Sequence, residues 1–164
     1  MDAPGTGMPG PPVADLEARF ARLEDEAAII RLKARYARFC DDGYDPEGIA
    51  GLFVPNGVWD GGELFGRAEG ADAIRAFFAG ASEYIPWALH FTLNPLIEVA
   101  PDGRTATGSW YLWQPCIRKR RRGAVLSWLA GTYADTYERL DDGWRFREVL
   151  VRARWLEEAP PPTG

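Results

Sequence analysis

Residues 104–114 read Arg-Thr-Ala-Thr-Gly-Ser-Trp-Tyr-Leu-Trp-Gln, a segment in which every second residue from Ala106 to Leu112 is small or apolar. With a period of two, Ala106, Gly108, Trp110 and Leu112 share one face of a strand. The segments 87–99, 124–139 and 143–156 are equally rich in Trp, Tyr, Thr, Val and Leu, and turn residues separate the four. The second half of the chain therefore predicts strands joined by hairpins.

The first half of the chain has helical periodicity instead. A stripe of apolar residues recurs every three or four positions after Val13: Leu16, Phe20, Leu23, Ala27, Ile30, Ala34 and Ala37. Asp41-Asp42-Gly43 should end this helix, and Asp45-Pro46 should cap a short helix from Glu47 to Phe53. A strand at 58–60 and a helix over 71–79 follow, the latter burying Ile74, Phe77 and Phe78. Helices followed by antiparallel strands predict an α+β fold, in which three N-terminal helices close a strongly curved sheet around one pocket.

Composition and charge indicate a single globular domain. Hydrophobic residues make up 46% of 164 residues, and the net charge of −5 argues against nucleic-acid binding as the main function. Cys40 and Cys116 suggest neither a disulfide framework nor a zinc site, so we expect a reduced, cytoplasmic setting. No apolar run is long enough to cross a bilayer, and the N-terminus has no signal-peptide pattern. We expect one domain over residues 13–158, with disordered tails at 1–12 and 159–164.

The chain has one histidine, His90, which excludes a histidine-rich metal site. Imidazole is the side chain whose ordinary pKa suits proton transfer near neutral pH, although a histidine between Leu89 and Phe91 can also be a hydrogen-bonded core residue. Thr92 and Asn94 would share its strand face. No P-loop or dinucleotide-binding glycine motif is present, so no cofactor is expected.

Other polar and aromatic residues are candidates for a site in the pocket. Tyr36 and Cys40 share a helix face, and Asp41 follows at the helix end, where it could also be a simple polar stop. Arg152 could face the pocket or pair with Glu148 on its own strand. The aromatic residues Trp59, Trp110, Tyr111 and Trp113 could provide pocket wall or core.

The sequence resembles the SnoaL-like branch of the nuclear transport factor 2-like (NTF2-like) superfamily. The resemblance rests on Ala28–Asp41, Leu52-Phe-Val-Pro, Gly66–Ala71, His90–Pro95, Ala106–Leu112 and Gly131–Trp144. It is similar in particular to the cofactor-free lyases of that branch: the bile-acid dehydratases, scytalone dehydratase and hexachlorocyclohexane dehydrochlorinase.

That resemblance implies an Asp–His dyad formed by Asp41 and His90, with Tyr36 and Arg152 on further active-site positions. It also implies a dehydratase reaction on a hydrophobic, ring-containing molecule such as a steroid or polyketide. Trp110, Gln114 and Val149 depart from residues that individual relatives use, so no particular substrate follows. The expected catalytic residues are His90, Asp41 and Tyr36, and the expected substrate-binding residues are Asn94, Arg152, Trp110, Trp59 and Tyr111.

Three alternatives remain at the level of sequence. The same base could serve an isomerase or a polyketide cyclase, or the pocket could bind a small molecule without turnover. The basic run Arg118–Arg122 could contact nucleic acid, although a solvated hairpin tip explains it. The Trp-rich sheet and the resemblance also lead us to expect a homo-oligomer, a dimer or trimer, with no nucleic-acid or membrane partner.

Overall fold

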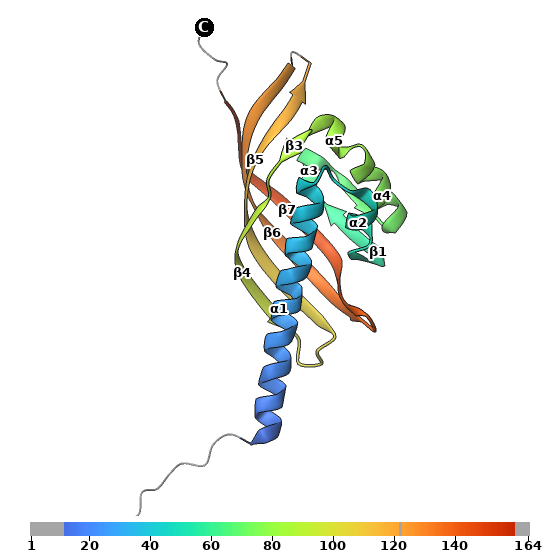
Figure 1. The fold of residues 1–164 in the computed structure, drawn as a ribbon, viewed down its shortest axis with the longest axis vertical. Helices are drawn as coiled ribbons and strands as arrows, with labels where there is room; N and C mark the ends of the chain where they lie inside the picture. Colours follow the sequence, from blue (N-terminus) through green and yellow to red (C-terminus); the bar gives the residue numbers. More distant parts are fainter. Residues whose placement is uncertain (1–11, 122, 160–164) are drawn as a thin grey trace, which may run out of the picture.

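The computed structural model describes residues 12–121 and 123–159. Apart from Pro12 and Ala159, the expected tails at 1–12 and 159–164 therefore lie outside the described residues. A long, curved sheet forms one layer, and the helices lie on its concave side (Figure 1). Five strands carry most of the sheet: β1 (Phe53–Asp60), β4 (Phe91–Val99), β5 (Thr105–Arg120), β6 (Gly123–Leu140) and β7 (Gly143–Glu158). The short strands β2 (Arg67–Glu69) and β3 (Trp87–Ala88) pair at its margins.

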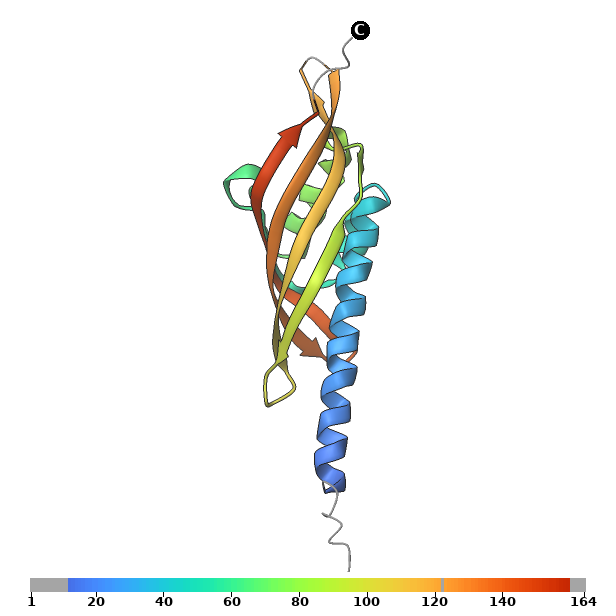
Figure 2. The ribbon, with the colours of Figure 1, turned by 90° about the vertical axis from the view of Figure 1, so that its left-hand side faces the viewer.

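The strand order is β2-β1-β7-β6-β5-β3, and β4 also pairs with β5. All pairings are antiparallel except that of β1 with β7, which is parallel. The sheet curves without closing, as Figure 2 shows from the side. The predicted α+β class and curved sheet are confirmed.

Helices cover the concave face. They are α1 (Val13–Asp41), α2 (Pro46–Ala50), α3 (Gly62–Phe65), α4 (Ala71–Ala79) and α5 (Ala81–Tyr84). The predicted cap is present, since Asp45 Oδ1 accepts hydrogen bonds from the Glu47 and Gly48 N–H groups, both at 3.1 Å. In α4, Ile74 and Phe78 are buried and Phe77 packs partly against the core. The two single-turn helices α3 and α5 were not expected from the sequence.

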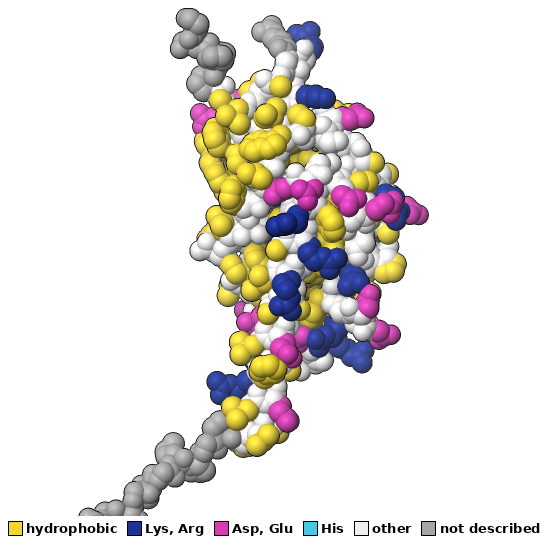
Figure 3. Space-filling model, viewed as in Figure 1, with side chains coloured by type: hydrophobic (Ala, Val, Ile, Leu, Met, Phe, Trp, Pro, Cys, Tyr) yellow, Lys and Arg dark blue, Asp and Glu magenta, His cyan; other side chains and the backbone are white. Residues whose placement is uncertain are grey.

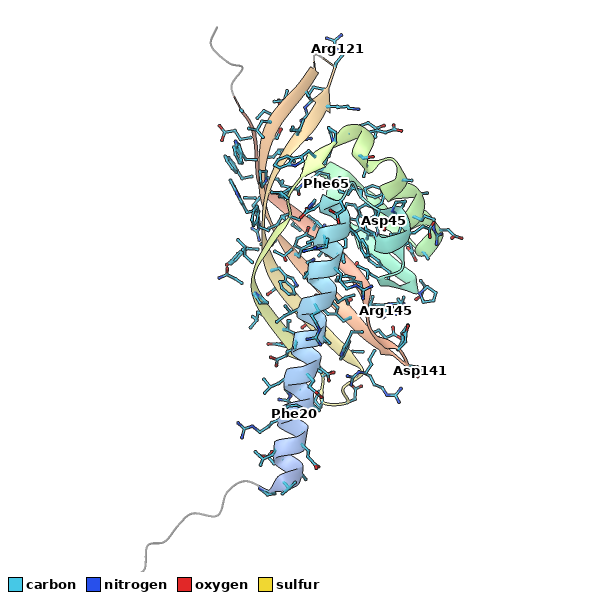
Figure 4. All side chains as sticks on the ribbon, viewed as in Figure 1. Phe20, Asp45, Phe65, Arg121, Asp141 and Arg145 are labelled. Atoms are coloured by element: carbon cyan, nitrogen blue, oxygen red, sulfur yellow. The ribbon has the colours of Figure 1, made fainter. Side chains whose placement is uncertain are left out.

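The buried face of α1 shares only Ala37 with the predicted apolar stripe. Its N-terminal turns project beyond the sheet and leave Phe20 exposed (Figures 1 and 4). The buried face consists of Asp25, Ile29, Leu32, Lys33, Tyr36, Ala37 and Cys40. Asp25 is bound by Arg139 and by Trp144 Nε1, and Lys33 is paired with Asp135. Because two charged residues are paired inside, hydrophobicity alone pointed to the wrong face.

Although α1 has 29 residues, no helix in the described part of the chain combines the length and apolarity that a membrane-spanning segment needs.

Candidate active site

Asp41 and His90 are 49 residues apart in sequence and in direct contact. Asp41 Oδ1 lies 2.8 Å from His90 Nδ1, and it also accepts a 2.8 Å hydrogen bond from the His90 backbone N–H. A carboxylate can only accept, so Nδ1 carries the proton of the neutral ring and Nε2 is left with a free lone pair. No described residue forms a hydrogen bond with Nε2. The pair thus presents an oriented base.

The end of α1 fixes this contact. The Asp42 N–H donates to Arg38 O, and the helix then stops because Gly43 and Tyr44 take positive φ angles of 90° and 63°. A bulky residue rarely adopts a positive φ angle. At Tyr44 this backbone conformation turns the ring against His90, with ring centroids 5.9 Å apart and ring planes at 89°. Tyr44 was not predicted as a site residue, because nothing in a lone Tyr after Gly indicates where its ring will point.

His90 lines a cavity of about 450 Å³ between the concave face of the sheet and the helices. This volume suits a small organic molecule. Most of the lining is aromatic or aliphatic, and its described members are Tyr36, Tyr44, Trp59, Leu64, Phe65, Phe77, Phe78, Gly80, Ala81, Tyr84, Ile85, Leu112, Gln114, Arg118, Lys119, Arg120, Leu129, Tyr133 and Val151.

Tyr36 projects from the buried face of α1 into this lining. Its hydroxyl accepts a 2.8 Å hydrogen bond from Trp59 Nε1, on β1. An indole N–H can only donate, so the Tyr36 O–H proton is available to another acceptor. Burial raises the pKa of Tyr36 well above its ordinary value, which keeps the phenol protonated. Tyr36 is therefore a neutral hydrogen-bond donor at the cavity wall, oriented by Trp59.

Two predicted binding residues lie away from the cavity because the strands contain bulges. On β4 the pairing slips between Leu93 and Leu96, and Asn94 takes a φ of 51° and is exposed. On β7 the pairing slips after Phe146, which reverses the two faces of the strand beyond that point. The period of two had placed Asn94 on the face of His90, and the resemblance had placed Arg152 at an active-site position; neither residue lies in the cavity lining.

Arg152 instead forms an ion pair with Asp60, at 3.1 Å, and not with Glu148. The Asp60 carboxylate accepts a hydrogen bond from the Gly62 N–H at 2.7 Å, and this bond together with Arg152 lowers its pKa. The pair ties β7 to the segment before α3.

Two predicted aromatic residues also lie outside the cavity lining. Tyr111 is on the outer face of β5 and 60% exposed, as the alternation of that strand requires. Trp110 faces inward, but it is buried in the core, where its Nε1 donates to the Tyr137 hydroxyl at 3.2 Å.

Gln114 was missed as a site residue, although the sequence contained a signal for it. The alternation from Ala106 to Leu112 continues to Gln114, which is buried and lines the cavity. Because Phe91 pairs with Trp113 and Leu89 N–H donates to Pro115 O, Gln114 lies across from His90. Its amide can bind a polar group of a ligand.

A metal centre has no support in the described part of the chain. No three His, Cys, Asp or Glu side chains converge there as ligands would.

The chain is similar to several crystal structures across most of its length. They include a protein of Novosphingobium aromaticivorans provisionally designated a scytalone dehydratase, with 23% identity and a TM-score of 0.75 over 87% of this chain and 93% of that one. A hexachlorocyclohexane dehydrochlorinase of Novosphingobium barchaimii has 19% identity and a TM-score of 0.74, over 87% and 99% of the two chains. An NTF2-like protein of N. aromaticivorans with a cystatin-like fold has 27% identity and a TM-score of 0.67, over 90% and 92%. None of the curated protein sequences compared matches this chain.

The family is established by the sequence itself rather than by these folds. A match to the family described as the SnoaL-like domain extends over residues 21–149, from the middle of α1 to β7. It includes Tyr36, Asp41 and His90. The chain belongs to the SnoaL-like domain family of the NTF2-like superfamily.

Proposed function

We propose that this protein is a cofactor-independent lyase, a dehydratase that uses Asp41 and His90 to remove a proton next to a carbonyl group. The observation that carries the proposal is the Asp41–His90 contact at the wall of an apolar cavity, with Nε2 unengaged by the described residues. Two structural neighbours named as a dehydratase and a dehydrochlorinase support the same reaction class.

In the proposed reaction, the Nε2 lone pair of His90 takes a proton from the carbon next to the carbonyl. The imidazolium so formed is stabilised by the Asp41 carboxylate, which holds Nδ1–H at 2.8 Å. Charge develops on the carbonyl oxygen as an enolate, and the Tyr36 O–H donates to it. The C–O bond to a β-hydroxyl group then breaks, a C=C bond forms, and the proton on Nε2 leaves with the hydroxide as water.

The lining of the cavity supports a hydrophobic, ring-containing substrate of the steroid or polyketide kind. The rings of Trp59, Phe77 and Phe78 pack against one another, with centroids 4.5–5.4 Å apart and the Phe78 ring nearly perpendicular to the other two, and form an aromatic wall. Aromatic side chains provide apolar surface against which fused or aromatic rings can pack face-on or edge-on.

A β-hydroxy ketone with two aromatic rings, 1,3-diphenyl-3-hydroxypropan-1-one, provides a direct assay. Its dehydration product, chalcone, is followed by near-ultraviolet absorbance. We expect turnover by the wild type and a loss of about 10²–10⁴-fold in His90→Ala and Asp41→Asn, the usual contribution of a positioned base. Asp42→Asn is the matched control, because Asp42 is adjacent in sequence but exposed. Wild-type rates in folded His90→Ala and Asp41→Asn would refute the mechanism.

The same assay in D₂O separates the alternatives. An isomerase or cyclase would exchange the proton next to the carbonyl without losing water, so the substrate would gain deuterium and keep its hydroxyl group. A binding protein without catalysis would do neither, although it would still bind the ketone.

We also propose that the chain forms a homo-oligomer through the outer face of the sheet. Hydrophobic side chains gather along that side of the molecule (Figure 3). Trp113 stacks on Trp128 and Trp155 at centroid distances of 5.8 and 6.0 Å, and Tyr111 and Leu96 are more than half exposed beside them. Single-molecule surfaces rarely leave so much aromatic area in water. Light scattering at micromolar concentration should find a dimer or trimer, and Tyr111→Lys should dissociate it; a wild-type monomer would refute this proposal.

A further inference from the structure

The basic run at the tip of the β5–β6 hairpin reaches the cavity. Arg118, Lys119 and Arg120 are part of the described lining, whereas no Asp or Glu is. One end of an otherwise apolar cavity therefore has a concentration of positive charge. The sequence had suggested either a solvated tip or a nucleic-acid patch for these residues, and neither accounts for their place in the cavity wall.

Arg118 differs from Arg120 in having no acidic partner among the described residues. Arg120 is paired with Glu158, with its Nε at 2.6 Å from Oε1. Arg118 is half-buried, and no described carboxylate lies within ion-pair distance of it. Burial, followed by the nearby Arg120, lowers the pKa of Arg118. A partly desolvated guanidinium with no counter-ion is costly, and its planar donors match a carboxylate or another oxyanion.

The strand geometry sets the position of this charge relative to the base. Arg118 follows Gln114 by four residues on the same inward face of β5, and Gln114 lies across from His90. Four residues of a strand extend about 13 Å. A ligand bridging the two places would have an apolar body of two or three rings.

We propose that the ligand of this cavity is an amphiphile whose anionic group, a carboxylate or similar oxyanion, binds Arg118 at the cavity mouth while its apolar body fills the interior. The claim deepens the proposed function by placing the reacting carbon of the substrate at His90, at the end opposite the anionic group. Binding of the anion itself does not depend on catalysis.

Two fluorescent probes test this directly. 8-Anilinonaphthalene-1-sulfonate and N-phenyl-1-naphthylamine share the same rings, and only the first has an anionic group. In wild-type protein we expect the sulfonate to bind the more tightly. Arg118→Gln should weaken sulfonate binding about tenfold and change binding of the uncharged amine less than twofold. Arg121→Gln is the matched control, because Arg121 lies at the tip of the hairpin and outside the lining (Figure 4).

A second set of variants ties the binding to the cavity rather than to the outer tryptophan cluster. Ala81→Trp, or Leu64→Trp if the first fails to fold, should fill the cavity and weaken both probes, since both residues line it and neither is buried. The proposal is overturned if Arg118→Gln affects the two probes equally, if Arg121→Gln matches Arg118→Gln, or if a folded cavity-filling variant binds as wild type does. Because no turnover is measured, failure of the elimination chemistry would leave these results unchanged.

Discussion

The buried ion pair between Lys33 and Asp135 offers a quantitative test of the packing beneath the cavity. Lys33 Nζ lies 2.8 Å from Asp135 Oδ2, and both side chains are fully buried. The ammonium also lies 3.3 Å from the centroid of the Tyr133 ring, which forms part of the cavity lining. Lys33→Met removes the cation and leaves the carboxylate inside, where the Tyr137 hydroxyl, at 3.0 Å, remains as a donor.

The expected cost follows from this arrangement. Removing one partner of a buried ion pair destabilises a protein by about 3–5 kcal/mol, because an unpaired charge stays in a medium of low polarity. For a chain of this size, the melting temperature should fall by roughly 6–20 °C. The double variant Lys33→Met/Asp135→Leu should recover most of the loss, since a buried pair replaced by apolar groups is often nearly neutral.

The loss of stability in Lys33→Met should also depend on pH, and it should grow as pH rises. Burial already raises the pKa of Asp135 in the wild type, and removal of the lysine raises it further. The folded variant then binds a proton more readily than the unfolded chain, so its stability falls as pH rises from the ordinary value of 3.8 through the raised value. Urea titrations at several pH values should therefore find the smallest deficit in acid.

Lys119→Met is the matched control for these measurements. Lys119 is the other lysine of the chain and is exposed, so its loss should change the free energy of unfolding by less than about 0.5 kcal/mol. A deficit below about 1 kcal/mol in Lys33→Met, or no recovery in the double variant, would refute the argument from burial.

Three further predictions concern the sheet and the site. Gly131→Ala should destabilise the fold by about 1–3 kcal/mol, because a Cβ atom there would lie 2.6 Å from the backbone oxygen of Arg152; Gly80→Ala, with open space around it, should be nearly neutral in the same chemical denaturation experiment. Trp59→Phe removes the 2.8 Å hydrogen bond to Tyr36 and should lower the free energy of unfolding, measured by urea titration, by about 1 kcal/mol. In the chalcone assay it should lower kcat more than it raises KM. An unchanged kcat would contradict the orienting role of Trp59. Because the pKa of Asp60 is lowered in the folded state, its carboxylate stabilises the fold above pH 3.8, and this stabilisation is lost as pH falls through the lowered pKa. Asp60→Asn should therefore be less stable than wild type at pH 7, and the two should become equally stable in strong acid. A stability difference that stays constant across the pH titration would exclude the charge pairing with Arg152 as the cause of the destabilisation.

The sequence identified the candidate base because the chain has a single imidazole. The sequence was less informative about the other polar residues of the cavity lining. Gln114 continues an alternation visible in residues 104–114, but Tyr44 depends on a positive φ angle that no neighbouring residue dictates. Asn94 and Arg152 lie outside the cavity because one extra residue in a strand changes which face the side chains take, and a bulge leaves little trace in composition.

Hairpin turns, alternation along β5 and β6, and the helical period before residue 41 are properties of neighbouring residues. They were enough to determine the long elements and the α+β class, but not the single-turn helices α3 and α5. Contacts between distant segments depend on how those elements pack: which face of α1 is buried, where Arg152 finds its partner, and how the tip of the β5–β6 hairpin meets the cavity. Paired charges such as Lys33 and Asp135 satisfy each other only once the chain has folded, so local hydrophobicity gave no sign of this pair and only the tertiary structure placed it inside.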